Sequence, residues 1–72
     1  MDQSAQLIPD VRAVNHGSIW LVRGHTPAGE SWLQDNVEFL QWFGGAGVVE
    51  WRYMGPIVHG AQEAGLQVEV TQ

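Results

Sequence analysis

The chain has 72 residues and no cysteine, so neither a disulfide framework nor a thiolate metal site is available to stabilise it. Eight acidic residues against three arginines and no lysine give a formal net charge of -5. This balance disfavours binding to nucleic acids or anionic membranes, because neutralising phosphates requires several cations arranged together.

Residues 1–15 contain neither the basic nor the apolar segment of a signal peptide, and no apolar run approaches the roughly 18 residues that span a bilayer. The sequence therefore predicts a cytoplasmic protein. Residues 1–14 carry few apolar side chains and are expected to form a flexible arm, in which Leu7-Ile8 or Val11–Val14 could dock as a short edge strand. Residues 15–72 are expected to form a single small α/β domain.

A turn, a strand and a helix are predicted in the first part of this domain. Asn15–Ser18 has the composition of a turn, and Ile19–Val22 is apolar at every position, which indicates a central strand covered on both faces. Thr26 and Pro27 are residue types preferred at a helix N-cap and first position. The helix should end at about Asn36–Glu38. Its inward side is expected to comprise Ala28, Trp32, Leu33 and Val37.

A glycine-rich hairpin is predicted in the middle of the chain. The β-prone runs Phe39–Phe43 and Val48–Trp51 flank Gly44–Gly47, which is typical of two strands joined by a tight turn. The alternative is one long loop over residues 39–47, with only the second strand formed.

The last part of the domain predicts a helix and an alternating strand. The helix is expected over Tyr53–Ala64, with Pro56 tolerated because it lies in the first turn and Gly65 suited to the left-handed C-terminal position. Gly60 inside the helix suggests that another backbone approaches closely. The inward stripe should contain Tyr53, Ile57, Ala61 and Ala64, with Met54 and Val58 beside it. Leu66, Val68 and Val70 then alternate with polar residues, as in a strand with one buried face.

This order of elements predicts an α+β two-layer sandwich with the ferredoxin-like split βαβ arrangement, β-α-β-β-α-β, and helices on one face of the sheet. If the hairpin does not form, the order becomes β-α-β-α-β.

Residue types that can take part in catalysis are present, but they are not spaced as in known catalytic or metal-binding motifs. His16 and His25 lie at opposite ends of one predicted strand, and no two histidines have the i, i+4 spacing of a helical zinc site, so no metal or cofactor is predicted. Ser18, beside His16, is not in a nucleophile-elbow context. The glycines at 44–47 lack the lysine of a phosphate loop. Glu50 and Glu69 could meet across neighbouring strands, where a solvated acidic patch is the simpler expectation. We therefore expect a protein that is not an enzyme.

The helix-free face of the sheet is the remaining functional lead. If the last strand points its valines at the helices, some of the apolar residues of the other strands must point away. Aromatic side chains rimmed by charges are typical of protein–protein interfaces. The predicted partner-binding residues are Trp20, Val22, Trp42, Phe43, Glu50 and Glu69. Coverage by the arm or by a second copy of the chain, giving a homodimer, is the alternative.

Five short segments of the chain are distinctive as a set: Asn15–Ile19, Asn36-Val37, Gln41–Gly45, Val49-Glu50 with Arg52-Tyr53, and Ala64–Leu66. Together they resemble a family of small bacteriophage, prophage and plasmid proteins, and the similarity covers residues 15–70. The resemblance implies an accessory protein of a mobile element, acting in the bacterial host cell, and carries no catalytic residue with it.

Together these observations predict a small acidic protein-binding factor that inhibits a host defence or regulatory complex, of the anti-CRISPR or anti-restriction type. Its partner would be a host protein or protein complex. The alternative is a nucleic-acid-binding module of ferredoxin-like shape, which would bind single-stranded RNA by stacking on an aromatic sheet face and which the acidic charge disfavours.

Overall fold

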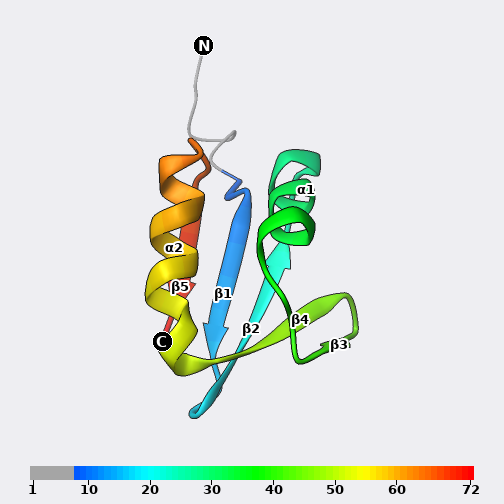
Figure 1. Cartoon of the computed structure of the whole chain (residues 1–72), viewed down its shortest axis with the longest axis vertical. Helices are drawn as coiled ribbons and strands as arrows, with labels where there is room; N and C mark the ends of the chain where they lie inside the picture. The colour runs from blue at the N-terminus through cyan, green and yellow to red at the C-terminus, as the bar shows by residue number, and fades with distance from the viewer. Residues whose placement is uncertain (1–7) are drawn as a thin grey trace.

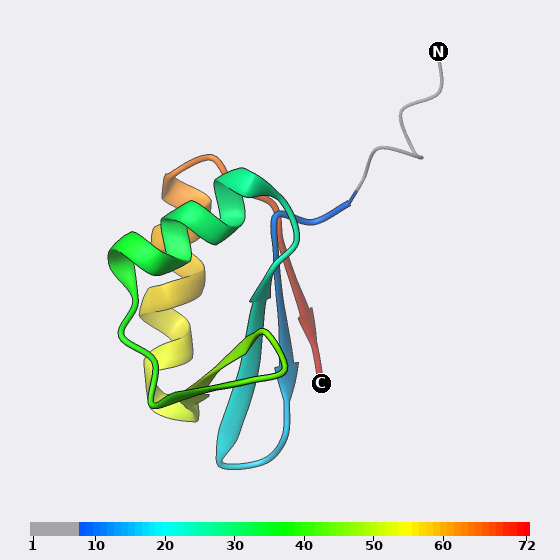
Figure 2. The same ribbon diagram turned by 90° about the vertical axis from the view of Figure 1, so that its right-hand side faces the viewer.

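The computed structural model describes residues 8–72 and shows a five-stranded mixed sheet with both helices on one face (Figures 1 and 2). The elements in chain order are β1 (Val11–Asn15), β2 (Ile19–Gly24), α1 (Pro27–Asn36), β3 (Gln41–Phe43), β4 (Ala46–Glu50), the 3-10 turn η2 (Trp51–Tyr53), α2 (Met54–Glu63) and β5 (Val68–Thr71). The expected α+β sandwich is confirmed. Within residues 8–72, the other face of the sheet carries no helix (Figure 2).

The strand order is β3-β4-β2-β1-β5, and only the pairing of β1 with β5 is parallel. A ferredoxin-like order is not confirmed, because it would place β2 directly beside β5. Here β1 lies between these two strands (Figure 1). Ile19–Val22 lies in a central strand, as predicted, but the strand is not covered on both faces: Trp20 and Val22 are buried, whereas Ile19 is exposed and Leu21 is half-buried.

Strand β1 corrects the predicted boundary of the N-terminal arm. Residues 11–14 are neither flexible arm nor edge strand, since Val11 and Ala13 are fully buried and the strand has a partner on each side. The pairing supplies backbone hydrogen-bond partners on both edges, and alternate side chains enter the core. The part of the expected arm before Ile8 lies outside the described residues.

Both helices have the predicted terminal signals. The Thr26 hydroxyl accepts a hydrogen bond from Gly29 N at 3.0 Å, and Pro27 is the first residue of α1. Gly65 has a φ of 86° at the end of α2, and Leu66 N donates to Ala61 O at 3.0 Å, which together form a Schellman motif.

The glycine hairpin is confirmed, and the long loop over residues 39–47 is wrong. Gly44 and Gly45 form a two-residue turn in which both φ angles are positive, as in a type I′ turn. Ala46 and Gly47 belong to β4 rather than to the turn. Any side chain at position 47 would overlap the ring of Phe39, which packs directly over this glycine.

The core lies between the sheet and the two helices, and Trp20 and Val22 are part of it. Their cross-strand partners on β4 are Val49 and Gly47, so all four residues face the helices. Trp20 is 9% exposed and Val22 is fully buried. The expectation that these two residues form a partner-binding surface on the open face is therefore wrong.

Helix α2 turns Ile57 and Ala61 inward as expected, whereas Tyr53 and Ala64 are exposed. Met54 and Ala61 are buried, Ile57 and Val58 pack against the core, and Tyr53 precedes the helix with half of its surface exposed. Gly60 is approached by a side chain rather than a backbone. A Cβ atom at this position would lie 3.1 Å from the indole ring of Trp32.

Asp10 joins three segments at one end of the sheet. Its carboxylate accepts hydrogen bonds from the Thr26 hydroxyl at 2.6 Å and from Gln67 N at 2.8 Å, and its carbonyl oxygen accepts one from His25 N. The hydrogen bond from Gln67, assisted by that from Thr26, lowers the pKa of Asp10 because both favour the charged carboxylate.

Candidate functional site

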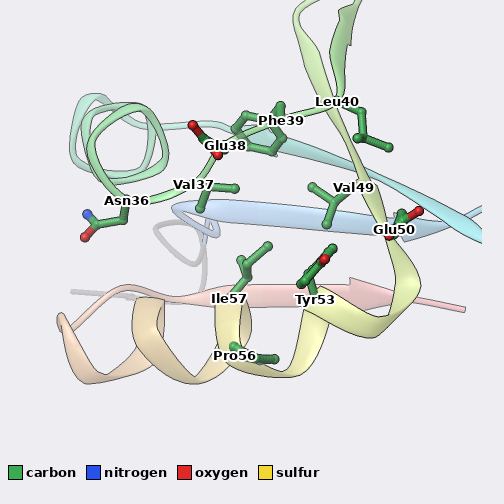
Figure 3. Close-up of a pocket in the computed structure, with 10 residues that line it drawn as sticks. All are labelled: Asn36, Val37, Glu38, Phe39, Leu40, Val49, Glu50, Tyr53, Pro56 and Ile57. Carbon is green, nitrogen blue, oxygen red and sulfur yellow. The ribbon is translucent and has the colours of Figure 1, made fainter.

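An apolar groove of about 570 Å³ lies between the chain that follows α1 and the first turns of α2. Figure 3 shows Val37, Val49, Tyr53 and Ile57 pointing into the space between these two walls. The complete lining comprises Asn36, Val37, Glu38, Phe39, Leu40, Val49, Glu50, Tyr53, Pro56 and Ile57. Its volume is within the range of ligand-binding pockets.

One wall is the extended segment that leaves α1. The helix ends at Asn36 because Val37 adopts extended backbone angles, with its N–H still donating to Leu33 O at 3.0 Å. The ring of Phe39 is held over Gly47 and lies 4.8 Å from the ring of Trp42. Leu40 N then donates to Val48 O, which begins the pairing of this segment with β4.

The other wall is fixed by the turn between β4 and α2. Trp51 N donates to Ser18 O at 3.1 Å, which holds η2 against the β1–β2 turn. Met54, the first residue of α2, is buried in the core. Pro56 is the third residue of this helix, where its missing N–H breaks no helical hydrogen bond. Tyr53 and Ile57 are thereby placed opposite the segment that follows α1 (Figure 3).

The groove has an apolar floor and acidic edges. Glu38 and Glu50 are the charged residues of the lining. Glu50 accepts a hydrogen bond from Arg52 Nε at 3.1 Å, and this bond raises the pKa of the arginine. The Arg52 guanidinium also lies 5.4 Å from the centre of the Tyr53 ring. Among residues 8–72, Glu38 has no hydrogen-bond or ion-pair partner.

Large apolar side chains remain exposed at and near this groove. Leu40 is 64% exposed and Tyr53 is 51% exposed, one on each wall. Trp42 is 54% exposed. It lines a second, smaller hollow of about 230 Å³, together with Leu33 and Gln34 of α1. A small protein that leaves such side chains in water presents a surface typical of an interaction site.

The predicted partner-binding residues do not form one site. Trp42 lies on β3 beside the smaller hollow and Glu50 lines the groove, whereas Trp20 and Val22 are core residues. Phe43 belongs to β3, and its side chain lies outside what the structure describes.

Glu69 is on the helix-free face, where it pairs with Arg12 at 2.8 Å. The expectation that Glu50 and Glu69 meet across neighbouring strands is wrong, because β2 and β1 separate β4 from β5. Three strand spacings correspond to about 14 Å.

Other candidate groups lie apart from the groove. His16 and His25 flank β2 at its opposite ends, as expected, and His59 pairs with Glu63 at 3.2 Å one helical turn later. The groove lining includes neither His16 nor Ser18. Within residues 8–72 no group of three metal-binding side chains occurs.

The RNA-binding alternative required aromatic side chains on the helix-free face, but Trp20, which was expected there, faces the helices instead. The three arginines are also engaged: Arg12 and Arg52 with glutamates, and Arg23 with Gly44 O at 2.9 Å. They are not arranged to follow a phosphate backbone.

Five residues of the groove lining were not expected at a binding site from the sequence: Glu38, Leu40, Tyr53, Pro56 and Ile57. One signal was available: Pro56 requires α2 to begin close to it, which places Tyr53 ahead of the helix rather than on its inward stripe. Nothing local to Glu38 or Leu40 indicated that they would face α2, because that contact depends on tertiary packing.

No protein-family model, curated protein or solved structure matches this chain. In the part of the chain that the structure describes, no helix has the length and apolar character needed to cross a membrane.

Proposed function

We propose that this protein is a small non-enzymatic binding factor that holds a host protein through the groove between the segment after α1 and α2. The observation that carries the proposal is the placement of exposed Leu40 and Tyr53 on opposite walls of an apolar groove. A few side chains, enriched in tyrosine, tryptophan and arginine and seated in well-packed pockets, provide most of the binding energy in protein interfaces.

The resemblance to proteins of bacteriophages and plasmids supports a more specific role. Two of the segments that carry it, Asn36-Val37 and Val49–Tyr53, supply half of the groove lining. We infer an accessory protein of a mobile element that acts in the bacterial cytoplasm by occupying a defence or regulatory complex, as anti-CRISPR or anti-restriction factors do. No residue of the groove is assigned a chemical step.

Affinity capture tests this function. The full chain, immobilised, should retain one stoichiometric partner from a lysate of the bacterial host. The double variant Leu40→Ala/Tyr53→Ala should lose that partner, with at least a tenfold loss of affinity, because truncating two interface anchors commonly costs more than about 1 kcal/mol each.

Trp51→Ala is the matched control, since Trp51 is 63% exposed and does not line the groove. It should retain the partner. Recovery of no protein above background, or equal loss in both variants, would contradict the proposal.

A further inference from the structure

We propose that the groove recognises a short partner segment in which a large apolar side chain lies next to an arginine or lysine. This inference rests on the proposed function and specifies the chemistry of the partner. The floor provided by Val37, Val49 and Ile57 has no polar side chain to satisfy, so an apolar group can enter it without leaving a buried donor or acceptor unpaired.

The charges at the groove determine which residue type is favoured next to that apolar side chain in the partner segment. Glu50 already shares its charge with Arg52, whereas Glu38 has no charged partner among residues 8–72. A cation next to the inserted side chain would lie beside Glu38 and would make the potentials of the two surfaces complementary. The net charge of -5 would attract the same partner over a longer range.

The same charges disfavour other occupants. A second copy of the chain would bring a surface of the same net negative charge against this acidic edge, and nucleic acid would add phosphates to it. An acidic or neutral apolar segment could fill the volume but would leave Glu38 without a counter-charge. A basic and apolar segment complements both the apolar floor and the acidic edge.

Selection from a library of random heptapeptides tests this chemistry. Peptides would be selected on the immobilised full chain and counter-selected on Leu40→Ala/Tyr53→Ala, in which both substitutions affect exposed side chains. The expected result is enrichment of arginine or lysine adjacent to leucine, phenylalanine, methionine or tryptophan. Peptides without excess positive charge, or peptides that bind the double variant equally well, would overturn the inference.

A charge variant with a matched control makes the test quantitative. Fluorescence anisotropy of one selected peptide should show binding roughly two- to fivefold weaker for Glu38→Gln, the range measured for exposed ion pairs. High salt should reduce this difference. Glu63→Gln removes the same charge outside the groove lining and should bind as the unsubstituted chain does.

Equal weakening by both variants would show general charge attraction and would overturn the inference. If groove variants lose a captured host protein while peptide selection shows no basic preference, this inference fails and the proposed function stands. If no host protein is captured at all, the proposed function fails.

Discussion

Asp10 stabilises the fold through a single carboxylate that connects β1, the N-cap of α1 and the start of β5. Its pKa is lowered in the folded chain, so the folded state binds fewer protons than the unfolded state. The resulting stabilisation is complete above the ordinary aspartate pKa of about 4 and is lost as the pH falls through the lower folded-state pKa.

We therefore expect Asp10→Asn to lower the free energy of unfolding at pH 7. The unfolding free energy of this variant should also change less as the pH falls. Urea denaturation at pH 7, 5 and 3 measures both effects. The unsubstituted chain should lose more stability than the variant over the acidic part of this range. Parallel losses in the two proteins would show that the hydrogen bonds from Thr26 and Gln67 do not favour the charged carboxylate.

The four tryptophans are not equivalent, and substitutions of two of them should have very different effects on the free energy of unfolding. Trp20 fills the core between β2 and the helices, so Trp20→Ala should cost about 3–5 kcal/mol of unfolding free energy. Trp51 is mostly exposed, and Trp51→Ala should change stability by no more than about 0.5 kcal/mol. Urea midpoints compare the two. A small loss for Trp20→Ala would contradict its assignment to the core.

At the scale of elements, α1 approaches the start of β1 at a position that only glycine allows. A Cβ atom at Gly29 would overlap the carbonyl oxygen of Asp10, which is backbone and cannot rotate away. Gly29→Ala should therefore destabilise the chain by about 1–3 kcal/mol, as overpacking does.

Gly55→Ala is the matched control for this substitution. Gly55 lies in the first turn of α2, its added Cβ would meet no atom within 4 Å, and alanine should stabilise the helix by about 0.5–1 kcal/mol. Thermal unfolding of the two variants should thus shift in opposite directions. An unchanged or raised melting temperature for Gly29→Ala would show that the close packing of α1 on β1 is absent in solution.

Elements whose signals are local were predictable from the sequence. Thr26-Pro27, Gly44-Gly45 and Gly65 each determine a cap or a turn through their own backbone preferences, and all three lie where expected. Strand β1 was expected only as a possible edge strand over Val11–Val14, and its position between two partner strands was not predictable in this way. Val11–Asn15 is short and partly polar, and it becomes a strand because β2 and β5 pair with its two edges from distant positions in the sequence.

Which residues of β2 face the helices could not be inferred from the local sequence either. An apolar run such as Ile19–Val22 does not indicate which of its residues turn toward the helices, because every position is suited to burial. The register with β4 decides this, and it assigns Trp20 to the core. The part of the open-face site that was predicted from this strand is therefore wrong. Trp42, another of the predicted partner-binding residues, is exposed.

At the scale of the whole molecule, the groove depends on the packing of three separate segments. The end of α1, strand β4 and the start of α2 each contribute lining residues (Figure 3). Hairpin closure over Gly47 positions Phe39 and Leu40, and the contact of Trp51 with Ser18 positions Tyr53. Sequence alone could not indicate this arrangement, since no motif spans the three segments.

Photo-crosslinking tests most directly whether this groove holds a partner. A benzoylphenylalanine in place of Leu40 should crosslink to a host protein on irradiation, because residue 40 projects from the groove wall into solvent. The same group in place of Gln62, exposed on α2 outside the groove lining, should give no such product. Crosslinking at position 62 with none at position 40 would contradict the account.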